Sequence, residues 1–318
     1  MPKAQKYKIY LLLVFVMATW GFNVIATKIL VTTFPTLTIT SIRVFTAAIS
    51  VFLILSFFKM VRLPSKKELR YIIAAGFFNV VCHHFFLSMG LTKTTASNGG
   101  LILGLGPLLS TIVAFLFLKS RVTVPKVVGI ILGFAGVAFI VASGNGGLSL
   151  RGISNGDLFV FLSIFTQSYS FVLIKKISDT LDPRLMTGYM LLFGSIVLFF
   201  ISLFAEPGGL KKIPHGSLEV WMIFLASAVI ATAIGHMIYN SAIGKVGVTE
   251  SAIFINLNPF FALVGAVLFL GEKISSPQIL GFLFILFGVL FGSGALEEFL
   301  HQSRLKKIPA HRGNVKNL

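Results

Sequence analysis

The second half of this sequence repeats the first at a single fixed offset. Segment 245–292 aligns with segment 93–140 without a gap, at the offset of 152 residues that places Pro259 on Pro107. The aligned pairs share a lysine, an aromatic residue and glycines: Lys245 with Lys93, Phe269 with Phe117, Gly281 with Gly129, and Gly288 with Gly136. A chain made of two copies of one unit is expected to fold into two related halves, an organisation typical of polytopic membrane proteins.

The composition requires an apolar environment around the folded chain. Hydrophobic residues make up 56% of the 318 residues, charged residues only 12%, and the mean hydropathy is +0.93. Soluble domains are nearer ~45–50% apolar and ~25% charged, so we expect the lipid bilayer to be a partner of this chain. The net charge of +17 would suggest nucleic acid in a soluble protein. Because the basic residues lie between apolar runs and form no single stripe, we expect no nucleic-acid partner.

Ten apolar runs follow one another along the chain, at residues 9–30, 37–58, 69–91, 95–118, 124–143, 155–175, 184–204, 219–243, 247–270 and 276–296. Each is close to the ~20 residues that an α-helix needs to cross ~30 Å of hydrocarbon. None shows the alternation of a barrel strand. The predicted fold class is an all-α integral membrane protein with ten transmembrane helices. The first run begins like a signal peptide, but it is long and has no cleavage site, so we expect it to be retained.

Lysine and arginine are unevenly divided between the two sides that ten crossings define. With the amino terminus in the cytoplasm, 20 of the 27 Lys and Arg residues fall on the inner side, 6 on the outer side, and Arg43 within a span. The positive-inside rule then predicts that both termini are cytoplasmic. An odd number of crossings in each half makes the repeat inverted. The predicted segments are a cytoplasmic amino terminus (1–8), a first repeat (9–143), a linker (144–154), a second repeat (155–296) and a basic cytoplasmic tail (297–318).

A proline lies near the centre of one span in each half, Pro107 in the fourth and Pro259 in the ninth. A proline inside a helix removes a backbone hydrogen bond and clashes with the preceding turn, so both helices should kink or open. The residues beside each proline suit such a break. Gly104 and Gly106 make the backbone of the first helix flexible, and the side chains of Asn256 and Asn258 can form hydrogen bonds with the freed backbone groups of the second. Such paired breaks indicate a cavity at the middle of the membrane. The alternative is that both prolines only kink their helices for packing.

Spans one and six carry polar and aromatic residues at their middle, Trp20 and Asn23 in the first, Gln167 and Tyr169 in the second. Polar atoms at that depth must face the interior of the bundle. For Asn23 and Gln167 a hydrogen bond between helices is as reasonable as a contact with a ligand. Trp20 suits both packing and stacking on a substrate.

Arg43 is predicted within span two, toward its outer end. Its long stem could carry the guanidinium out to the membrane surface. Otherwise it is a cation inside the cavity, suited to bidentate binding of a carboxylate. No Asp or Glu lies deep in any span to neutralise it, which favours a role in ligand binding.

Histidines occupy the same position in the two copies, His84 and His236. Because the repeat inverts, counting residues along each span places them at opposite ends of a cavity. The spacing brings no three or four ligands together, so we expect no metal site and no cofactor. Further polar residues share helix faces with the histidines and are predicted to line the cavity or its gates, with buried packing as the alternative: Asn79 and His83 on one span, His236, Tyr239 and Asn240 on the other.

Glu250 is the one acid predicted inside a span, in the first turn of span nine. A charge favoured by the helix dipole is the simpler interpretation, and a coupling carboxylate near the inner gate is the other.

A stripe formed by Gly129, Gly133 and Gly136 permits close helix contact, either within the chain or between two copies. The sequence leaves monomer and homodimer open.

Several of these residues together resemble a known family. Trp20-Gly21-x-Asn23, Pro35 followed by Arg43, a mid-helix proline in each half, and Phe269-Leu270-Gly271-Glu272 before a Gly-rich last span are similar to the EamA family of the drug/metabolite transporter superfamily. The resemblance covers about 9–296 as two tandem EamA repeats. It implies an inverted-repeat fold of ten helices around a central cavity, and export of amino acids or related metabolites across a bacterial inner membrane. The first copy has Ser120 where the second has Glu272, which we expect to pair locally with Lys273.

The predicted function is a carrier of small polar metabolites that works by alternating access. We expect an amino-acid-like cargo whose carboxylate is held by Arg43, Asn256 and Asn258 against Trp20. A channel-like facilitator is the alternative. An intramembrane enzyme would need a nucleophile, a base or a metal set at one depth, which the sequence does not offer. Direction and driving force are left open.

Overall fold

The computed structural model describes residues 3–118, 124–142, 154–213 and 216–292. Every regular element in these ranges is helical, as predicted. Ser120, all of the predicted linker except Ser154, and the tail at 297–318 lie outside the described residues.

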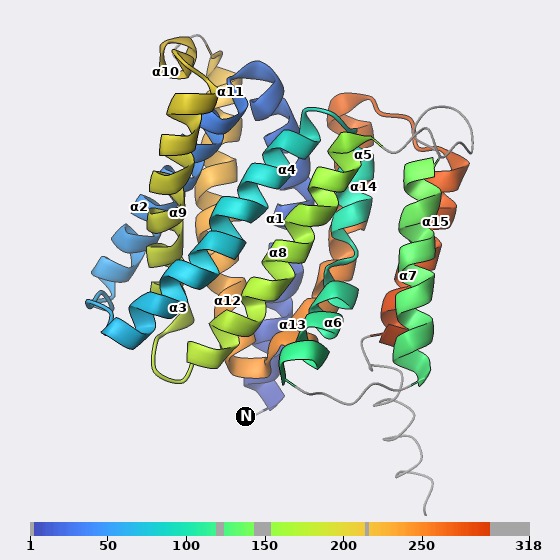
Figure 1. Cartoon of the computed structure of the whole chain (residues 1–318), viewed down its shortest axis with the longest axis horizontal. Helices are drawn as coiled ribbons and strands as arrows, with labels where there is room; N and C mark the ends of the chain where they lie inside the picture. The colour runs from blue at the N-terminus through green and yellow to red at the C-terminus, as the bar shows by residue number, and fades with distance from the viewer. Residues whose placement is uncertain (1–2, 119–123, 143–153, 214–215, 293–318) are drawn as a thin grey trace, which may run out of the picture.

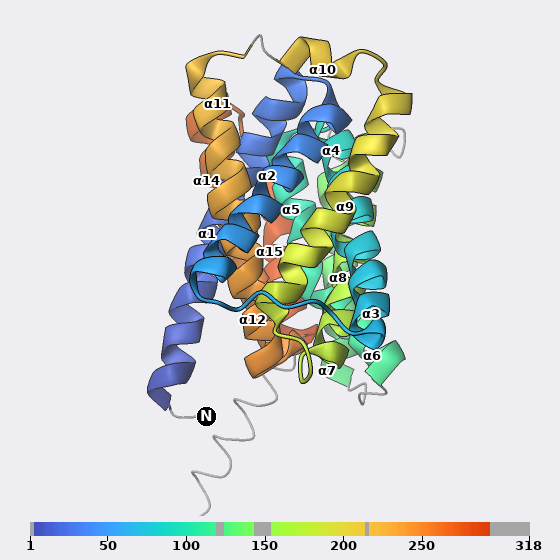
Figure 2. The ribbon, with the colours of Figure 1, turned by 90° about the vertical axis from the view of Figure 1, so that its left-hand side faces the viewer.

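The helices of the first half run in one bundle with those of the second (Figures 1 and 2). The first half consists of α1 (Lys3–Thr33), α2 (Thr36–Phe57), α3 (Lys66–Gly76), η1 (Phe77–Cys82), α4 (His83–Leu91), α5 (Ala96–Leu103), α6 (Gly106–Leu118) and α7 (Val124–Ala142). The second half consists of α8 (Asn155–Ile177), α9 (Pro183–Ala205), α10 (Gly209–Lys212), α11 (Leu218–Leu225), η4 (Ala226–Ile234), α12 (Gly235–Val246), α13 (Val248–Ile253), η5 (Phe254–Leu257), α14 (Asn258–Leu270) and α15 (Ser276–Gly292).

The apolar helices are long enough for a multi-pass membrane protein. Among the described residues, 8 helices have the length and hydropathy of a membrane span, and α7 and α15 add shorter apolar stretches at Val127–Gly136 and Ser276–Gly288. Large apolar side chains such as Phe57 and Phe204 point outward and are exposed. Exposing this apolar surface to water would cost free energy, so it is expected to face the hydrocarbon of a membrane.

Glycines let α7 and α15 approach each other closely at one edge of the bundle (Figure 1). A Cβ added to Gly136 would lie 2.6 Å from the carbonyl oxygen of Gly281, and one added to Gly288 would lie 2.6 Å from the amide nitrogen of Gly133. The contact is reciprocal, because Gly136 and Gly288 are equivalent positions of the two copies. The glycine stripe therefore serves packing within the chain.

Two helical segments are wound as π-helix, η1 in the first half and η4 in the second. Their last residues, Cys82 and Ile234, are equivalent in the two copies. In η4 the hydroxyl of Thr232 donates to the carbonyl of Ser227, five residues back, at 2.8 Å. These turns were not predicted from the sequence, and π-turns are frequent at functional sites. Both lead directly into the helices, α4 and α12, that carry His84 and His236.

Close packing of α1 on α14 depends on Gly21. A Cβ at Gly21 would lie 2.4 Å from the Cβ of Phe261 and 2.9 Å from the carbonyl oxygen of Asn258. We expect Gly21→Val to destabilise the protein by about 3 kcal/mol, because overpacking forces the two helices apart. The measurement is the thermal unfolding midpoint in detergent, with the outward-facing substitution Ala205→Val as control. Equal midpoints for the two variants would contradict this packing.

Candidate functional site

Both predicted helix breaks are present, and they lie against each other. Helix α5 ends at Leu103 and α6 begins at Gly106, while the 3-10 turn η5 precedes α14. Pro259 occupies the first turn of α14, where its missing N–H leaves no helical carbonyl unpaired. A Cβ at Gly104 would lie 2.6 Å from Cγ of Pro259, so the absence of a side chain allows the two breaks to touch.

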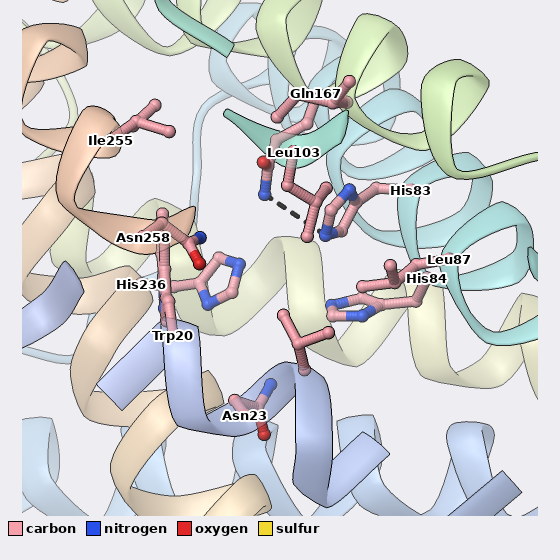
Figure 3. A pocket seen from close by; sticks show the side chains of 12 residues that line it. Trp20, Asn23, His83, His84, Leu87, Leu103, Gln167, His236, Ile255 and Asn258 are labelled. Carbon is pink, nitrogen blue, oxygen red and sulfur yellow. Dashed lines mark hydrogen bonds between the residues drawn. The ribbon is translucent and has the colours of Figure 1, made fainter. Parts of the chain in front are cut away.

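A small cavity lies beside these breaks, at the meeting point of helices from both halves (Figure 3). Its volume is about 40 Å³, which accommodates roughly three water molecules. The lining residues combine aliphatic walls with polar side chains: Trp20, Asn23, Val24, His83, His84, Leu87, Leu103, Ile164, Gln167, His236, Ile255 and Asn258. A cavity of this size must widen before it can hold a metabolite.

Trp20 and Asn23 reach the cavity from α1 and are anchored to η4. The indole Nε1 of Trp20 donates to the carbonyl of Ala231 at 2.9 Å, and its ring packs on His236 with centroids 4.9 Å apart. Asn23 accepts a hydrogen bond of 2.5 Å from the hydroxyl of Ser227. Both residues therefore combine a packing role with a place on the cavity wall.

His83 and Gln167 form a closed hydrogen-bonded unit on the opposite side. Nδ1 of His83 lies 3.1 Å from the carbonyl oxygen of Ser163, and its Nε2 lies 3.3 Å from Nε2 of Gln167 (Figure 3). The amide nitrogen of Gln167 only donates, so Nε2 of His83 accepts and Nδ1 carries the proton, with the carbonyl of Ser163 as acceptor and its hydroxyl 3.2 Å from the same nitrogen. Both ring nitrogens of His83 are thus occupied.

Arg43 is buried in the bundle, with 1% of its surface exposed. Its guanidinium donates to Thr232 at 3.0 Å and to Ser227 at 3.2 Å, and lies 3.3 Å from Nδ1 of His84. In the described part of the chain it has no carboxylate within ion-pair distance. The guanidinium therefore lies inside the bundle, behind His84 as seen from the cavity.

Three buried polar atoms at the cavity have no hydrogen-bond partner among the described residues. They are Nε2 of His84, Nε2 of His236 and Oδ1 of Asn258. A buried polar group without a partner costs about 1–3 kcal/mol, so native proteins rarely leave one without a reason. A ligand that bonded to these atoms would remove that cost.

The expected separation of His84 and His236 is wrong. Their rings lie on one cavity with centroids 5.9 Å apart, and the rings of His83 and His84 are 4.9 Å apart. The prediction counted depth along straight, upright helices, whereas α3, η1 and α4 cross the bundle obliquely (Figure 1). Within the described ranges, no three His, Cys, Asp or Glu side chains are arranged to hold a metal ion.

Other predicted residues lie away from the cavity. Asn79 donates to Ser170 at 2.6 Å, joining η1 to α8, and Asn240 donates to Thr187 at 2.9 Å, joining α12 to α9. Asn256 is half-buried in η5 and does not line the cavity.

The two predicted tyrosines pack on aromatic rings. Tyr239 is fully buried, with ring centroids 5.0 Å from Trp20 and 5.1 Å from Phe171, so it supports the cavity wall from behind. Tyr169 is half-buried and packs on Phe78 and Phe117 at 4.7 and 5.0 Å, away from the lining residues.

Sequence reasoning also missed parts of the site. The aliphatic walls gave no signal, because leucine and isoleucine occur throughout every span. Ser227 and Thr232, which hold Arg43, were missed because hydroxyl residues are common in membrane helices. Only their spacing of five residues, one π-turn, could have drawn attention to them.

Glu250 lies at the end of the bundle that contains the amino terminus. Its carboxylate accepts a hydrogen bond from Tyr10 and forms an ion pair of 2.8 Å with Lys6. It therefore ties the start of α13 to α1, which favours the interpretation of a helix-end charge.

The expected pairing of Glu272 with Lys273 is also wrong. One carboxylate oxygen of Glu272 accepts from the amide of Ala96 at 2.9 Å, and the other accepts from the amide and hydroxyl of Ser97 at 2.9 and 2.6 Å. Glu272 thus caps the amino terminus of α5 and joins the two helices that contain the breaks. Carboxylates are favoured at this position by the free N–H groups and by the helix dipole.

Known proteins resemble this chain over most of its length. The uncharacterized transporter YyaM of Bacillus subtilis is 30% identical over 73% of this chain and 75% of its own length. The uncharacterized transporter YvbV of the same organism is 25% identical over 90% of this chain and 91% of its own. A crystal structure with 17% identity superposes with a TM-score of 0.67 over 94% of this chain and 99% of that chain, which shows a shared fold.

The family comparison assigns the same description to each half. Residues 7–142 and 154–293 each match the EamA-like transporter family. The names of the relatives and of the family indicate a transporter and not an enzyme. The resemblance seen in the sequence is thereby confirmed, and this multi-pass membrane protein belongs to the EamA-like transporter family.

Proposed function

We propose that this transporter is a carrier of small, carboxylate-bearing metabolites, and that it works by alternating access at the central cavity. The single observation that carries the proposal is the set of buried polar atoms without partners where the two helix breaks meet, on His84, His236 and Asn258. Interrupted helices at the middle of the membrane are where transporters bind their substrates.

The ten spans form two inverted five-helix repeats in this proposal. The helix contacts support it, because each contact in one half has a counterpart in the other half. Helix α1 packs on α12 and α14, and α8 packs on the equivalent helices α4 and α6. The pairs α2 with α9 and α7 with α15 each join equivalent helices. An approximate two-fold axis in the membrane plane that relates the two halves would produce these paired contacts.

The cargo is an amino acid or a closely related metabolite. A buried cation, Arg43, with no carboxylate partner in the described residues favours an anionic group on the substrate. The aliphatic walls of the cavity, which include Leu87 and Ile164, suit an apolar side chain. Trp20 provides an aromatic surface beside these groups.

The excess of lysine and arginine on the side of the amino terminus supports cytoplasmic termini. The similar transporters of Bacillus subtilis support a bacterial cell membrane. Export is the proposed direction, from the family resemblance. Reporter fusions to the carboxyl-terminal tail and to the 144–154 linker are expected to lie in opposite compartments. The same compartment for both would contradict the inverted repeat.

Counterflow in proteoliposomes tests the function directly. Vesicles that contain the purified protein and unlabelled amino acids are expected to accumulate labelled amino acid transiently and with saturation, because a carrier exchanges substrates through one site. An open pore gives equilibration without accumulation. Equilibration alone would therefore establish a channel-like facilitator in place of a carrier.

A further inference from the structure

The hydrogen bonds of His236 determine which of its nitrogens carries the proton. Nδ1 lies 2.9 Å from the backbone carbonyl oxygen of Thr232, which can only accept. Nδ1 therefore donates, and in the neutral ring Nε2 presents a lone pair. That lone pair has no partner among the described residues and lies at the cavity.

His84 has the opposite arrangement. Its Nδ1 lies 3.3 Å from the guanidinium of Arg43, which can only donate. Nδ1 therefore accepts, and the proton is on Nε2. This N–H has no acceptor within the described structure and also lies at the cavity. Arg43 is a positioning residue here, since it determines the tautomer of His84 and adds positive charge behind it.

The two free atoms face one space. The rings of His84 on α4 and His236 on α12 approach the cavity from opposite sides, with centroids 5.9 Å apart (Figure 3). Asn258 adds a second unpartnered acceptor, its Oδ1, beside His236. His83 does not take part, because Ser163 and Gln167 occupy both of its nitrogens.

We propose that His84 and His236 act as a hydrogen-bond donor and acceptor pair that selects a substrate carrying an anionic oxygen beside an N–H group. The inference rests on the proposed function and assigns its polar subsites. The substrate carboxylate accepts from Nε2 of His84, with the charge of Arg43 behind the ring. The substrate amino group donates to Nε2 of His236 and to Oδ1 of Asn258.

This assignment explains why the site combines a buried cation with neutral acceptors. A carboxylate alone would satisfy His84 and leave His236 and Asn258 without partners. An amine alone would satisfy the acceptors and place its positive charge near Arg43. A molecule with both groups satisfies all three buried atoms, and sites with buried polar groups discriminate strongly against analogues that lack a matching group.

The first part of the test compares three probes in proteoliposomes. Counterflow of each of the twenty radiolabelled amino acids identifies the best substrate. Its deaminated acid and its decarboxylated amine are then used as competitors. We expect each analogue to compete at least roughly tenfold more weakly than the amino acid, because each leaves a buried polar group unpaired.

The second part uses paired substitutions that keep or remove the polar atom. His236→Gln retains an acceptor near the position of Nε2, and His236→Met removes it while keeping an apolar side chain of similar length. We expect His236→Met to lower the affinity for the amino acid roughly tenfold and to leave that for the deaminated acid unchanged. His236→Gln should restore most of the preference. Monodisperse elution and the unfolding midpoint establish that each variant folds.

The outcomes separate the inference from the function on which it rests. Equal competition by the amino acid and its deaminated acid would overturn the histidine pair while leaving a carboxylate carrier intact. His236→Met could instead lower the affinity for the amino acid and for its deaminated acid equally, with His236→Gln restoring neither. That result would give His236 a structural role and would also overturn the proposed donor and acceptor pair. Absence of counterflow for all twenty amino acids and for their deaminated acids would overturn the proposed function itself.

Discussion

Arg43→Met is expected to reduce counterflow by on the order of 100-fold while leaving the folded protein at least as stable as the natural one. The guanidinium is 1% exposed and held by hydroxyl groups and an imidazole, with no carboxylate among the described residues. Keeping a charge in such a place costs desolvation energy that these bonds repay only in part. Methionine fills the space of the side-chain stem and removes that cost. The loss of transport follows because His84 loses the donor that fixes its tautomer.

The measurements are the initial rate of counterflow and the thermal unfolding midpoint of the purified variant. Arg70→Met is the matched control, because Arg70 is exposed and lies away from the cavity. A midpoint that falls by several degrees in Arg43→Met alone would mean that Arg43 serves the fold. Unchanged transport would contradict its place in the site.

Glu272→Ala is expected to destabilise the protein by about 3 kcal/mol and to open the end of the cavity at which α5 begins. The substitution removes three hydrogen bonds to Ala96 and Ser97, including those of two amides at a helix amino terminus. These bonds connect the two broken helices, so their loss lets α5 and α14 separate. The alternating-access equilibrium should shift toward the state that is open at this end.

Labelling of a single cysteine detects such a shift. Leu103→Cys in a Cys82→Ser background places a thiol on the cavity wall, and a membrane-impermeant maleimide added from outside reports its accessibility. We expect faster labelling when Glu272→Ala is added. Glu219→Ala provides the control, since Glu219 is exposed in the first turn of α11. Identical labelling rates with and without Glu272 would exclude a gating role for this carboxylate.

The local sequence was enough to place a few residues. Pro107 and Pro259 lie at breaks, because a proline cannot continue the helical hydrogen bonding whatever surrounds it. Trp20 and Asn258 reach the cavity, because each lies in the middle of an apolar span where polar atoms must face inward.

The predictions were poorer for how far the cavity extends along each helix. Asn79 and His83 were expected on one face from their spacing of four residues. Both side chains do bond to one helix, α8, Asn79 to Ser170 and His83 to Ser163, but only His83 reaches the cavity. Asn240 lies one turn beyond His236 on α12 and bonds to α9, because a turn advances the chain by about 5.4 Å, past the end of a small cavity.

By itself the sequence determined the membrane environment, the helical class, the duplication and the two helix breaks. Each follows from hydropathy, run length or the chemistry of a single residue, none of which needs knowledge of distant partners. Only the tertiary structure brought His84 to His236, Arg43 to Ser227, and Glu272 to the start of α5, 176 residues away in the chain. Helix tilt and crossing decide such contacts, and no local pattern in the sequence encodes the distance between two helices.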